Sequence, residues 1–353
     1  MEEERRKDLR DTPITIVGAG AIGGTVGAYL DESGYDVTLV DVSLEHVEAI
    51  RNHGLRITGV RGERTFHPRV ILAEDLSGPL GPTFLCVKSH FTEEVVRELE
   101  PLLAPYGYIL SLQNGMNEAL IAERVGRERT VGAFVHFGAD LLEPGLIQLG
   151  YEATIHVGEL DGWITPRVEM LKEILGHAMP TRVTDNISGF LWGKLVFGAT
   201  AFVVSCVDVP VAEVIDDPLG RSLCRAASSE AYRVVRTQVE KVESIGEFEP
   251  ESFAPGDGME ERADESLATL AGAWRGATKQ HMGIWRDLKA KRRKTEVDML
   301  VGQLVETGRE RGISTPVNAA VLEMVHKIEN GEREMDWSNL QEISERSGFA
   351  PSG

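Results

Sequence analysis

A glycine-rich turn near the N-terminus constrains the fold of this chain more than any other feature. The apolar segment 14–20, ITIVGAG, is typical of a buried strand, and residues 21–34 follow as a helical segment. In the intervening pattern Gly18-x-Gly20-x-x-Gly23, the first glycine allows a tight turn and the second admits an anion close to the backbone. The third lets helix and strand pack closely. This order predicts a dinucleotide site at the helix N-terminus, where backbone amides attract a pyrophosphate.

Strands and helices alternate through the first half of the chain, which predicts an α/β fold with a doubly wound parallel sheet. We expect this domain to span residues 14–185, after a charged tail at 1–13. Its helices include the segments 21–34 and 92–103. The strand candidates are residues 14–20, 35–41, 84–89, 108–115 and 130–139. The strand signals stop around residues 154–166.

The second half is predicted to be an all-helical domain, residues 186–340, followed by a tail at 341–353. Apolar residues at 297, 300, 301, 304 and 305 have helical spacing, and Gly312 ends that helix. A further helix begins at Pro316, with Thr315 as its expected N-cap. The acidic stretch 241–275 lacks a clear period, so it is interpreted as a long surface insertion.

An aspartate at the end of the second predicted strand bears on the choice of dinucleotide. Asp41 follows the glycine motif by about 20 residues, where a carboxylate binds a ribose 2′-hydroxyl and repels a 2′-phosphate. The next residues, VSLEHV, include no Arg or Lys. The pattern favours NAD over NADP, although Asp41 capping the following turn is an alternative. The cofactor-binding residues predicted from these two motifs are Gly18, Gly20, Ala21, Ile22, Gly23 and Asp41.

The charge and the cysteines exclude several classes of partner and site. The formal net charge of −19 argues against nucleic acid and anionic membranes as partners, since both require basic patches. Cys86, Cys206 and Cys224 show no paired spacing, which is typical of reduced thiols in a cytoplasmic protein. The N-terminus lacks the apolar region of a signal peptide. The nine histidines show no ligand spacing, so no metal site is expected.

A single lysine interrupts the otherwise apolar stretch LWGKLVFGATAFVVSCV, residues 191–207. The glycines, acidic flanks and absence of positively charged anchors argue against a membrane span. On a helix, Lys194, Gly198, Ala201 and Ser205 share one face, and the two small residues leave a hollow beside the ammonium group. A lysine that only extends its amine to solvent is the structural alternative. A partly desolvated lysine has a lowered pKa, which suits proton transfer to and from a carbonyl oxygen.

These features together resemble the ketopantoate reductase family of the PanE/ApbA type. The matching stretches, in order, are GAGAIGG, CVKS, LQNGMN, WGKL, KTEVDMLVGQLVETGRERGISTPVN and VHKIE, and they extend from about residue 14 to residue 329. The resemblance implies a Rossmann domain followed by a helical domain for substrate binding and dimerisation, and therefore a homodimer. It also implies hydride transfer between a nicotinamide and a 2-oxo or 2-hydroxy acid without a metal.

The resemblance assigns roles to particular residues. Lys194 matches the lysine that protonates the carbonyl oxygen, and Glu296 matches an acidic partner near the substrate hydroxyl. Lys88 and Asn114 match residues that hold the cofactor. His136 matches a position at a strand end that borders the substrate. Without the resemblance, Glu296 would be interpreted as a solvated charge paired with a nearby arginine.

The sequence departs from the family pattern where the substrate is bound. The family usually has asparagines four and eight residues after the lysine, but this chain has Gly198 and Phe202. The family serine that binds the substrate carboxylate corresponds to Gly283, in a region with a one-residue insertion. We therefore expect a different hydroxy acid as substrate, since a site loses affinity when its hydrogen-bonding groups are removed. The candidate substrate-contacting residues are His136, Gly198, His281, Gly283 and Trp285.

Four hypotheses for the function follow. The leading one is an NAD-linked dehydrogenase of 2-hydroxy acids, in which Lys194 is the general acid and base. A ketopantoate reductase that uses NADPH is the close alternative. An opine-type dehydrogenase has a similar domain plan, but the KTEVD and WGKL stretches argue against it. A non-catalytic NAD-binding protein is the fourth, and the presence of both Lys194 and Glu296 argues against that.

Overall fold

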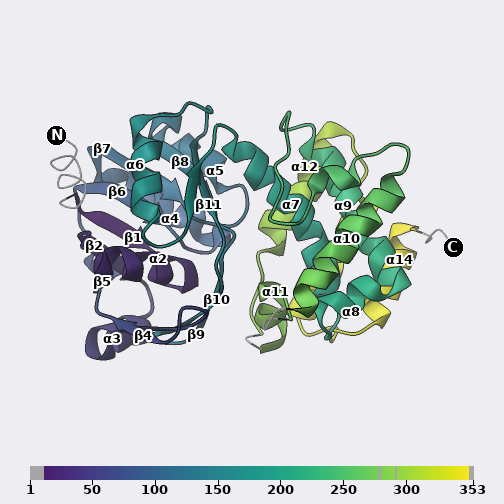
Figure 1. Ribbon diagram of the computed structural model, residues 1–353, viewed down its shortest axis with the longest axis horizontal. Helices are drawn as coiled ribbons and strands as arrows, with labels where there is room; N and C mark the ends of the chain where they lie inside the picture. Colours follow the sequence, from purple (N-terminus) through teal and green to yellow (C-terminus); the bar gives the residue numbers. More distant parts are fainter. Residues whose placement is uncertain (1–11, 277–279, 291, 350–353) are drawn as a thin grey trace. The chain divides into compact units, whose positions relative to one another are not determined.

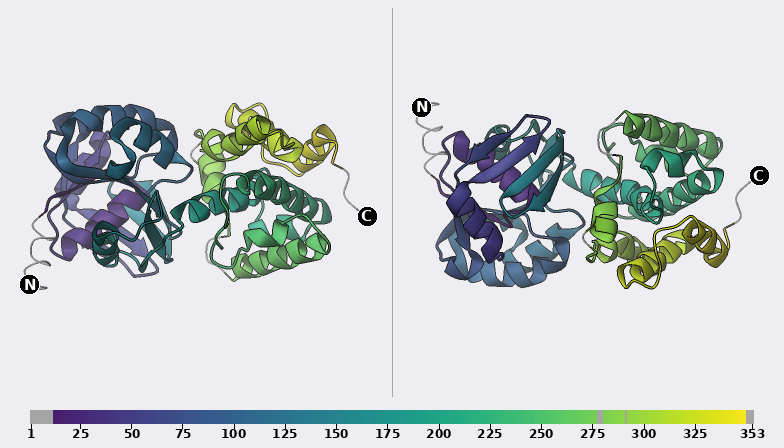
Figure 2. Two further views of the ribbon diagram at one scale, coloured as in Figure 1. Left: turned by 90° about the horizontal axis from the view of Figure 1, so that it is seen from above. Right: turned by 90° about the horizontal axis from the view of Figure 1, so that it is seen from below.

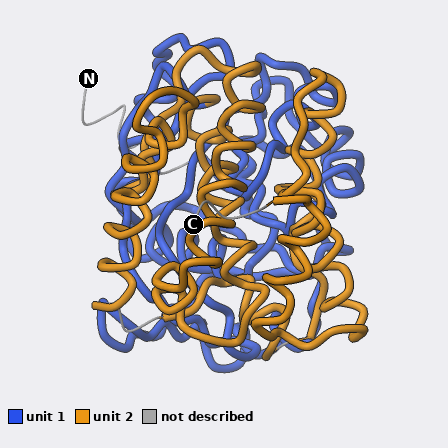
Figure 3. The backbone as a smooth tube through the Cα atoms, turned by 90° about the vertical axis from the view of Figure 1, so that its right-hand side faces the viewer, with its two compact units in different colours: residues 1–187 blue, residues 188–353 orange. Residues whose placement is uncertain are grey.

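The computed structural model describes residues 12–276, 280–290 and 292–349. The chain forms two compact units, residues 1–187 and residues 188–353 (Figure 3). The first unit contains the sheets and the second is helical, so the predicted α/β class with a helical C-terminal part is confirmed. The charged tail predicted for residues 1–13 lies almost wholly outside the described residues.

An eight-stranded sheet forms the centre of the first unit (Figure 1). All neighbouring strands are parallel except β11, which runs antiparallel to β8. In spatial order the strands are β12 (Thr181–Val183), β11 (Ile155–Glu159), β8 (Thr130–Phe134), β7 (Leu103–Ser111), β6 (Leu80–Leu85), β1 (Ile14–Val17), β2 (Val37–Asp41) and β5 (Arg69–Leu72). Strand β1 lies between β6 and β2, so the strand order reverses beside it, which is where doubly wound sheets bind ligands.

Helices pack on both faces of this sheet (Figure 2). In the described part of the unit, from residue 12 on, the α-helices are α2 (Ala21–Glu32), α3 (Leu44–His53), α4 (Thr92–Leu99), α5 (Asn117–Val125) and α6 (Pro166–Leu175). One hydrophobic cluster unites β1 with α2, α3 and α6, and the other unites the opposite face with α4 and α5. This layering leaves the loops at the carboxyl ends of the strands available to form a site.

A second sheet of four strands was not predicted. Its order is β4 (Arg64–Phe66), β3 (Leu55–Gly59), β10 (Leu146–Tyr151) and β9 (Gly138–Glu143). Strand β10 pairs in parallel with β3 although about ninety residues separate them, and such non-local pairing leaves little local signal. The predicted strand 130–139 is therefore wrong in its second half, because β8 ends at Phe134 and Gly138 begins β9 in the other sheet.

The second unit is built around helix α9 (Pro218–Val235), which contacts α8, α10, α12, α13 and α14. Its other helices are α7 (Ile187–Val204), α8 (Val211–Asp216), α10 (Met259–Arg275), α11 (Gly283–Trp285), α12 (Gln303–Arg311), α13 (Pro316–Glu329) and α14 (Ser338–Ser347). Of two π-helical turns, Arg286–Ala290 precedes the KTEVD segment and Asp298–Gly302 begins at its last residue. A π-helical turn accommodates an extra residue in a helix and is frequent at functional sites.

Two predictions about the second unit are wrong. The stretch 241–275 is not simply a surface insertion, because Val242, Ile245, Phe248 and Phe253 are buried and residues 259–275 form helix α10. The apolar positions in its first part follow no regular period, so the sequence pattern did not indicate burial. Residues 341–347 of the predicted tail belong to helix α14, whose Leu340 and Ile343 are fully buried.

Candidate functional site

The three motif glycines meet three different constraints. Gly18 has a φ of 98°, and a Cβ atom there would lie 2.9 Å from the backbone of Cys86. At Gly23 a Cβ would lie only 2.0 Å from the carbonyl oxygen of Gly18. Gly20, at the N-cap of α2, has no neighbouring atom within 4 Å of an added Cβ and no side chain capping the helix. The turn is thus tightly packed on one side and open at the helix N-terminus, as a bound pyrophosphate requires.

Buried polar side chains connect the loops after β6 and β7, which carry the CVKS and LQNGMN stretches. Asn117 donates hydrogen bonds to the Asn114 carbonyl at 2.6 Å and to the Ser89 hydroxyl at 3.2 Å. The Ser89 hydroxyl also donates to the Asn114 carbonyl. Lys88 directly precedes Ser89 in the first of these loops. The predicted cofactor residues Lys88 and Asn114 therefore lie on loops that are held together, next to the strand that leads into the glycine turn.

The same network continues into α4 through residues that the sequence analysis did not identify. Gln113 donates to the Val87 carbonyl at 2.9 Å and to the Thr92 hydroxyl at 2.8 Å, and Thr92 donates to the Asn117 amide oxygen at 2.9 Å. Thr92, Gln113 and Asn117 are buried. Buried polar groups of this kind are favourable when they are hydrogen-bonded to one another, and they then rigidify the loops that carry them. In the sequence, the signal that could have indicated this network is the presence of polar residues within an otherwise apolar strand and loop.

Asp41 bonds to two backbone amides. Its Oδ2 accepts from the Ala19 amide and its Oδ1 accepts from the Ser43 amide, both at 2.9 Å. The second bond is the turn cap that was the alternative interpretation of this residue. The first bond connects Asp41 to the glycine turn. Each carboxylate oxygen can accept a further hydrogen bond, so a role toward a ribose hydroxyl is compatible with this geometry and stays a prediction.

Lys194 lies on α7, and the helix is mostly buried. By length and composition α7 could cross a membrane, but 67% of it is buried within the protein, as in a core helix of a folded domain. Burial lowers the pKa of Lys194 to about 8, and the carboxylate of Glu296 opposes this shift. The structure thus brings the two predicted catalytic residues into electrostatic contact. A lysine with this pKa is present in both protonation states near neutral and mildly alkaline pH.

Along α7, the residue one turn after Lys194 has no side chain, whereas the residues near it are packed in the core. Gly198, one helical turn after the lysine, is buried, yet an added Cβ would meet no atom within 4 Å. Phe202, a further turn along, is fully buried in the core. Phe197 makes an edge-to-face contact with Phe248, from the segment predicted to be an insertion. The helix is therefore packed against other parts of the unit through Phe197 and Phe202, while free space remains beside Gly198.

Glu296 is 9% exposed, and the preceding residue, Thr295, is bonded to a side chain of α13. Glu329 accepts hydrogen bonds from both the amide and the hydroxyl of Thr295, at 2.7 and 2.6 Å. His326, also on α13, contacts Asp298 at 2.9 Å. The interpretation of Glu296 as a solvated helix charge is thus wrong, because the carboxylate is buried near Lys194. Glu329 and His326 belong to the VHKIE stretch, which was noted only as part of the resemblance.

Two of the candidate substrate residues, His281 and Trp285, form a cluster with Asp208. Their rings lie 4.3 Å apart, and the indole nitrogen of Trp285 donates to Asp208 at 2.7 Å. Lys289 pairs with the same carboxylate at 2.7 Å. Burial lowers the pKa of His281, while the nearby carboxylates oppose that shift. Gly283 is exposed between the two aromatic residues. A role of this cluster toward a substrate stays a prediction.

His136 lies just after β8, in the first unit. Its ring is 5.7 Å from that of Phe134 and 6.1 Å, edge to face, from that of Tyr151. The residue is half-buried. These aromatic contacts orient the imidazole at the end of a strand, as the resemblance implies for a residue near the substrate.

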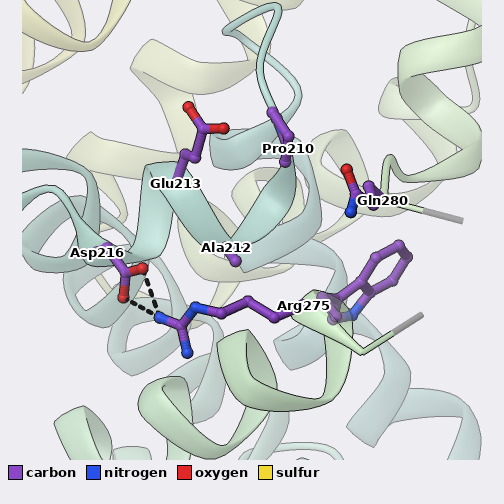
Figure 4. Close-up of a pocket in the computed structure, with 7 residues that line it drawn as sticks. Pro210, Ala212, Glu213, Asp216, Arg275 and Gln280 are labelled. Carbon is purple, nitrogen blue, oxygen red and sulfur yellow. Dashed lines mark hydrogen bonds and ion pairs between the residues drawn. The ribbon is translucent and has the colours of Figure 1, made fainter. Parts of the chain in front are cut away.

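A surface pocket of the second unit does not coincide with any of these residues (Figure 4). It is lined by Pro210, Ala212, Glu213, Asp216, Trp274, Arg275 and Gln280. Arg275 and Asp216 neutralise each other through two bonds of 2.6 and 2.5 Å. Among the described residues, no group of three or more His, Cys, Asp and Glu side chains could hold a metal ion.

Comparison with known proteins agrees with this architecture. The family model for ketopantoate reductase PanE/ApbA matches residues 14–162, and the model for the C-terminal part of the same family matches residues 186–329. The 2-dehydropantoate 2-reductase of Archaeoglobus fulgidus is 28% identical over 326 residues, which cover 92% of this chain and all of that protein. The enzyme of the same name from Mesorhizobium japonicum is 28% identical and covers 89% of this chain and 97% of its own.

Solved structures share the fold. D-mandelate dehydrogenase with NADH and anilino(oxo)acetate superimposes with a TM-score of 0.78 at 22% identity, covering 91% of this chain and 99% of that chain. A PanE/ApbA family ketopantoate reductase from Ralstonia eutropha gives a TM-score of 0.76 at 24% identity, covering 92% of this chain and all of that chain.

Proposed function

Because the chain belongs to the ketopantoate reductase family PanE/ApbA and is an NAD(P)-dependent oxidoreductase, we propose that it interconverts a 2-hydroxy acid and a 2-oxo acid with NAD as the preferred cofactor. The observation that carries the proposal is the pair formed by Lys194 and Glu296. The lysine lies on the largely apolar helix α7, burial lowers its pKa to about 8, and a buried carboxylate acts on it.

Lys194 is the general acid in the reductive direction. When a carbonyl is reduced, negative charge develops on its oxygen, and a nearby ammonium group stabilises that charge and then donates the proton. In the oxidative direction the neutral amine removes the hydroxyl proton. Partial desolvation strengthens the electrostatic effect, because the charge is less screened than in water. A pKa of about 8 makes both directions accessible near neutral pH.

Glu296 keeps the lysine usable as an acid. Without an opposing carboxylate, burial would lower the pKa of Lys194 further and leave less of the ammonium form at neutral pH. The carboxylate is also able to accept a hydrogen bond from the substrate hydroxyl. Thr295 and Glu329 hold the backbone on which Glu296 sits, so its position is defined by the fold.

The first unit fits a nicotinamide dinucleotide, which when bound donates or accepts the hydride. Gly20 and the amides at the start of α2 would hold the pyrophosphate, because the N-terminus of this helix has no capping side chain and no acidic residue in its first turn. Lys88 and Asn114, on the two connected loops, would complete the binding site. Asp41 and the absence of basic residues at 42–45 support the preference for NAD.

The free space beside Gly198 supports a 2-oxo acid other than ketopantoate. An asparagine at this position, as in the family pattern, would occupy that space and offer hydrogen bonds, whereas glycine does neither. The position of the second family asparagine is filled by Phe202, a core residue. The structure of D-mandelate dehydrogenase, a protein of the same fold, contains NADH and anilino(oxo)acetate, which supports a substrate with a larger side chain. A ketopantoate reductase proper is the second candidate, favoured by the names of the relatives.

A substrate screen that follows the absorbance of the reduced nicotinamide tests the proposal. NAD and NADP are offered with 2- and 3-hydroxy acids, and NADH and NADPH with the matching oxo acids, ketopantoate included. We expect the highest kcat/KM with NAD(H) and a 2-hydroxy or 2-oxo acid other than ketopantoate. Efficient turnover of ketopantoate with NADPH would instead establish the second candidate. Tight NADH binding without turnover of any acid would overturn both.

A further inference from the structure

A buried histidine contacts the glycine turn from outside the motif. His46, on α3, is 2% exposed, and its Nε2 lies 2.9 Å from the carbonyl oxygen of Ala19. Its Nδ1 accepts a hydrogen bond of 3.0 Å from the amide of Gly145, in the turn between β9 and β10. The imidazole therefore bridges the glycine turn and the second sheet, both within the first unit.

The two contacts define the tautomer of this histidine. The Gly145 amide can only donate, so Nδ1 must be the unprotonated nitrogen, and Nε2 carries the proton that is donated to Ala19. The imidazole is thus neutral and satisfied at both nitrogens. A buried side chain with both polar atoms bonded holds a single orientation.

Both backbone polar groups of Ala19 are consequently fixed by side chains. The Ala19 amide donates to Asp41 and the Ala19 carbonyl accepts from His46. Ala19 lies between the first two motif glycines and is fully buried. We propose that His46 is a positioning residue for the dinucleotide, because it holds the Ala19 peptide in the orientation that leaves the helix N-terminus open to the pyrophosphate. The inference rests on the proposed NAD(H) binding and adds to it the residue that shapes the turn.

The constraint extends to the β9–β10 turn. Gly145 has a φ of 77°, and its carbonyl accepts a hydrogen bond from the Arg56 amide on β3 at 2.9 Å. The turn that donates to His46 is therefore anchored in the second sheet. A preorganised loop binds its ligand more tightly, since less conformational freedom is lost on binding. The second sheet thus supports the cofactor turn through one imidazole.

Two substitutions separate the bonds that His46 makes. In His46→Gln the side-chain amide reaches the position of Nε2 and can still donate to Ala19. In His46→Asn the shorter amide reaches only the position of Nδ1, so the bond to Gly145 is kept and the bond to Ala19 is lost. The dissociation constant of NADH is measured by fluorescence titration of the purified chain, with no substrate present. The melting temperature of each variant is measured in parallel, and His53→Gln, an exposed change on the same helix, is the control.

We expect His46→Asn to weaken NADH binding about tenfold and His46→Gln to stay within about threefold of the wild type. The control should match the wild type. Equal dissociation constants for the two His46 variants, or values that simply follow their melting temperatures, would overturn the inference. A wild-type chain that binds no nicotinamide dinucleotide would instead overturn the proposed function, so the two failures are distinguishable.

Discussion

The glycine turn (residues 18–23) and the lysine helix α7 prepare for charged chemistry in opposite ways. In the turn the functional groups are backbone amides, and they are held by hydrogen bonds of Ala19 with Asp41 and His46 and by close packing of Gly18 against the Cys86 backbone. In the helix the functional group is one ammonium group, and burial acts against its charge. The turn is already arranged for an anion, whereas the helix keeps its lysine in an unfavourable environment that lowers its pKa.

This difference predicts how each region responds to substitution. A change in the turn acts through shape, so it should alter cofactor affinity or folding. A change at Lys194 or Glu296 acts through charge, so it should alter turnover and its pH dependence while cofactor affinity stays the same. The following predictions test that separation, from the largest expected effect to the smallest.

Removal of the lysine should have the largest effect. We expect Lys194→Ala to lower kcat about 10³-fold, because it removes both the proton donor and the charge that stabilises the developing alkoxide. The dissociation constant of NADH should change less than twofold. Steady-state kinetics and fluorescence titration measure the two quantities, with Lys172→Ala, an exposed lysine on α6, as the control. A Lys194→Ala variant with a kcat within tenfold of the wild type would show that this residue is not the general acid.

Two glycines of the turn should respond differently to the same added methyl group. Gly23→Ala places a Cβ 2.0 Å from the Gly18 carbonyl oxygen, so we expect a loss of about 1–3 kcal/mol in the free energy of unfolding. Gly20→Ala meets no protein atom and has a permitted φ of −67°, so stability should be unchanged while NADH binds about tenfold more weakly. Denaturant unfolding and NADH titration test the pair. Equal stability losses would contradict the assigned roles.

Neutralising Glu296 should shift the pH dependence of catalysis. Its carboxylate raises the pKa of Lys194 against the effect of burial, so Glu296→Gln should lower that pKa below about 8. In the reductive direction the protonated lysine is required, so activity falls as pH rises, and this decline should move to lower pH by on the order of one unit. In the oxidative direction the rise should move to lower pH by the same amount. Profiles of kcat against pH that coincide with the wild type would exclude electrostatic coupling between the two residues.

The smallest effect is expected for the preference between NAD and NADP when Asp41 is replaced. Asp41→Asn removes the charge that repels a 2′-phosphate but keeps an oxygen that can accept from the Ala19 amide. We expect the ratio of kcat/KM for NAD over NADP to fall about fivefold, mostly through improved use of NADP. Assays with both cofactors at fixed ionic strength measure the ratio. If it is unchanged, Asp41 acts only as the cap and anchor that its two backbone bonds describe.

Local patterns predicted several elements of each unit. The glycine spacing, the apolar strand before it and the helical period after it indicated β1, the turn and α2, since these depend on neighbouring residues. Gly312 ends α12, as predicted, and it has the left-handed conformation there. Thr315 lies at the expected N-cap of α13, but the amides of Val317 and Asn318 are instead capped by Glu230 from α9.

Contacts between distant segments were not predictable in the same way. His46 appeared in the sequence only as part of a stretch without Arg or Lys, and nothing local indicated that it would reach Ala19 and Gly145, which are 27 and 99 residues away. The burial of Phe248 against Phe197 likewise depends on packing rather than on a period. Such contacts arise only when several elements are already in place.

The sequence by itself determined the α/β and helical halves, the glycine turn and the single lysine in an apolar helix, because each depends on residue type and short-range spacing. Only the tertiary structure decided that Glu296 acts on Lys194, that Gly198 borders free space, and that Ala19 is held by Asp41 and His46. The reason is physical: desolvation, Coulomb interactions and buried hydrogen bonds depend on distances in space, which neighbouring letters of the sequence do not contain.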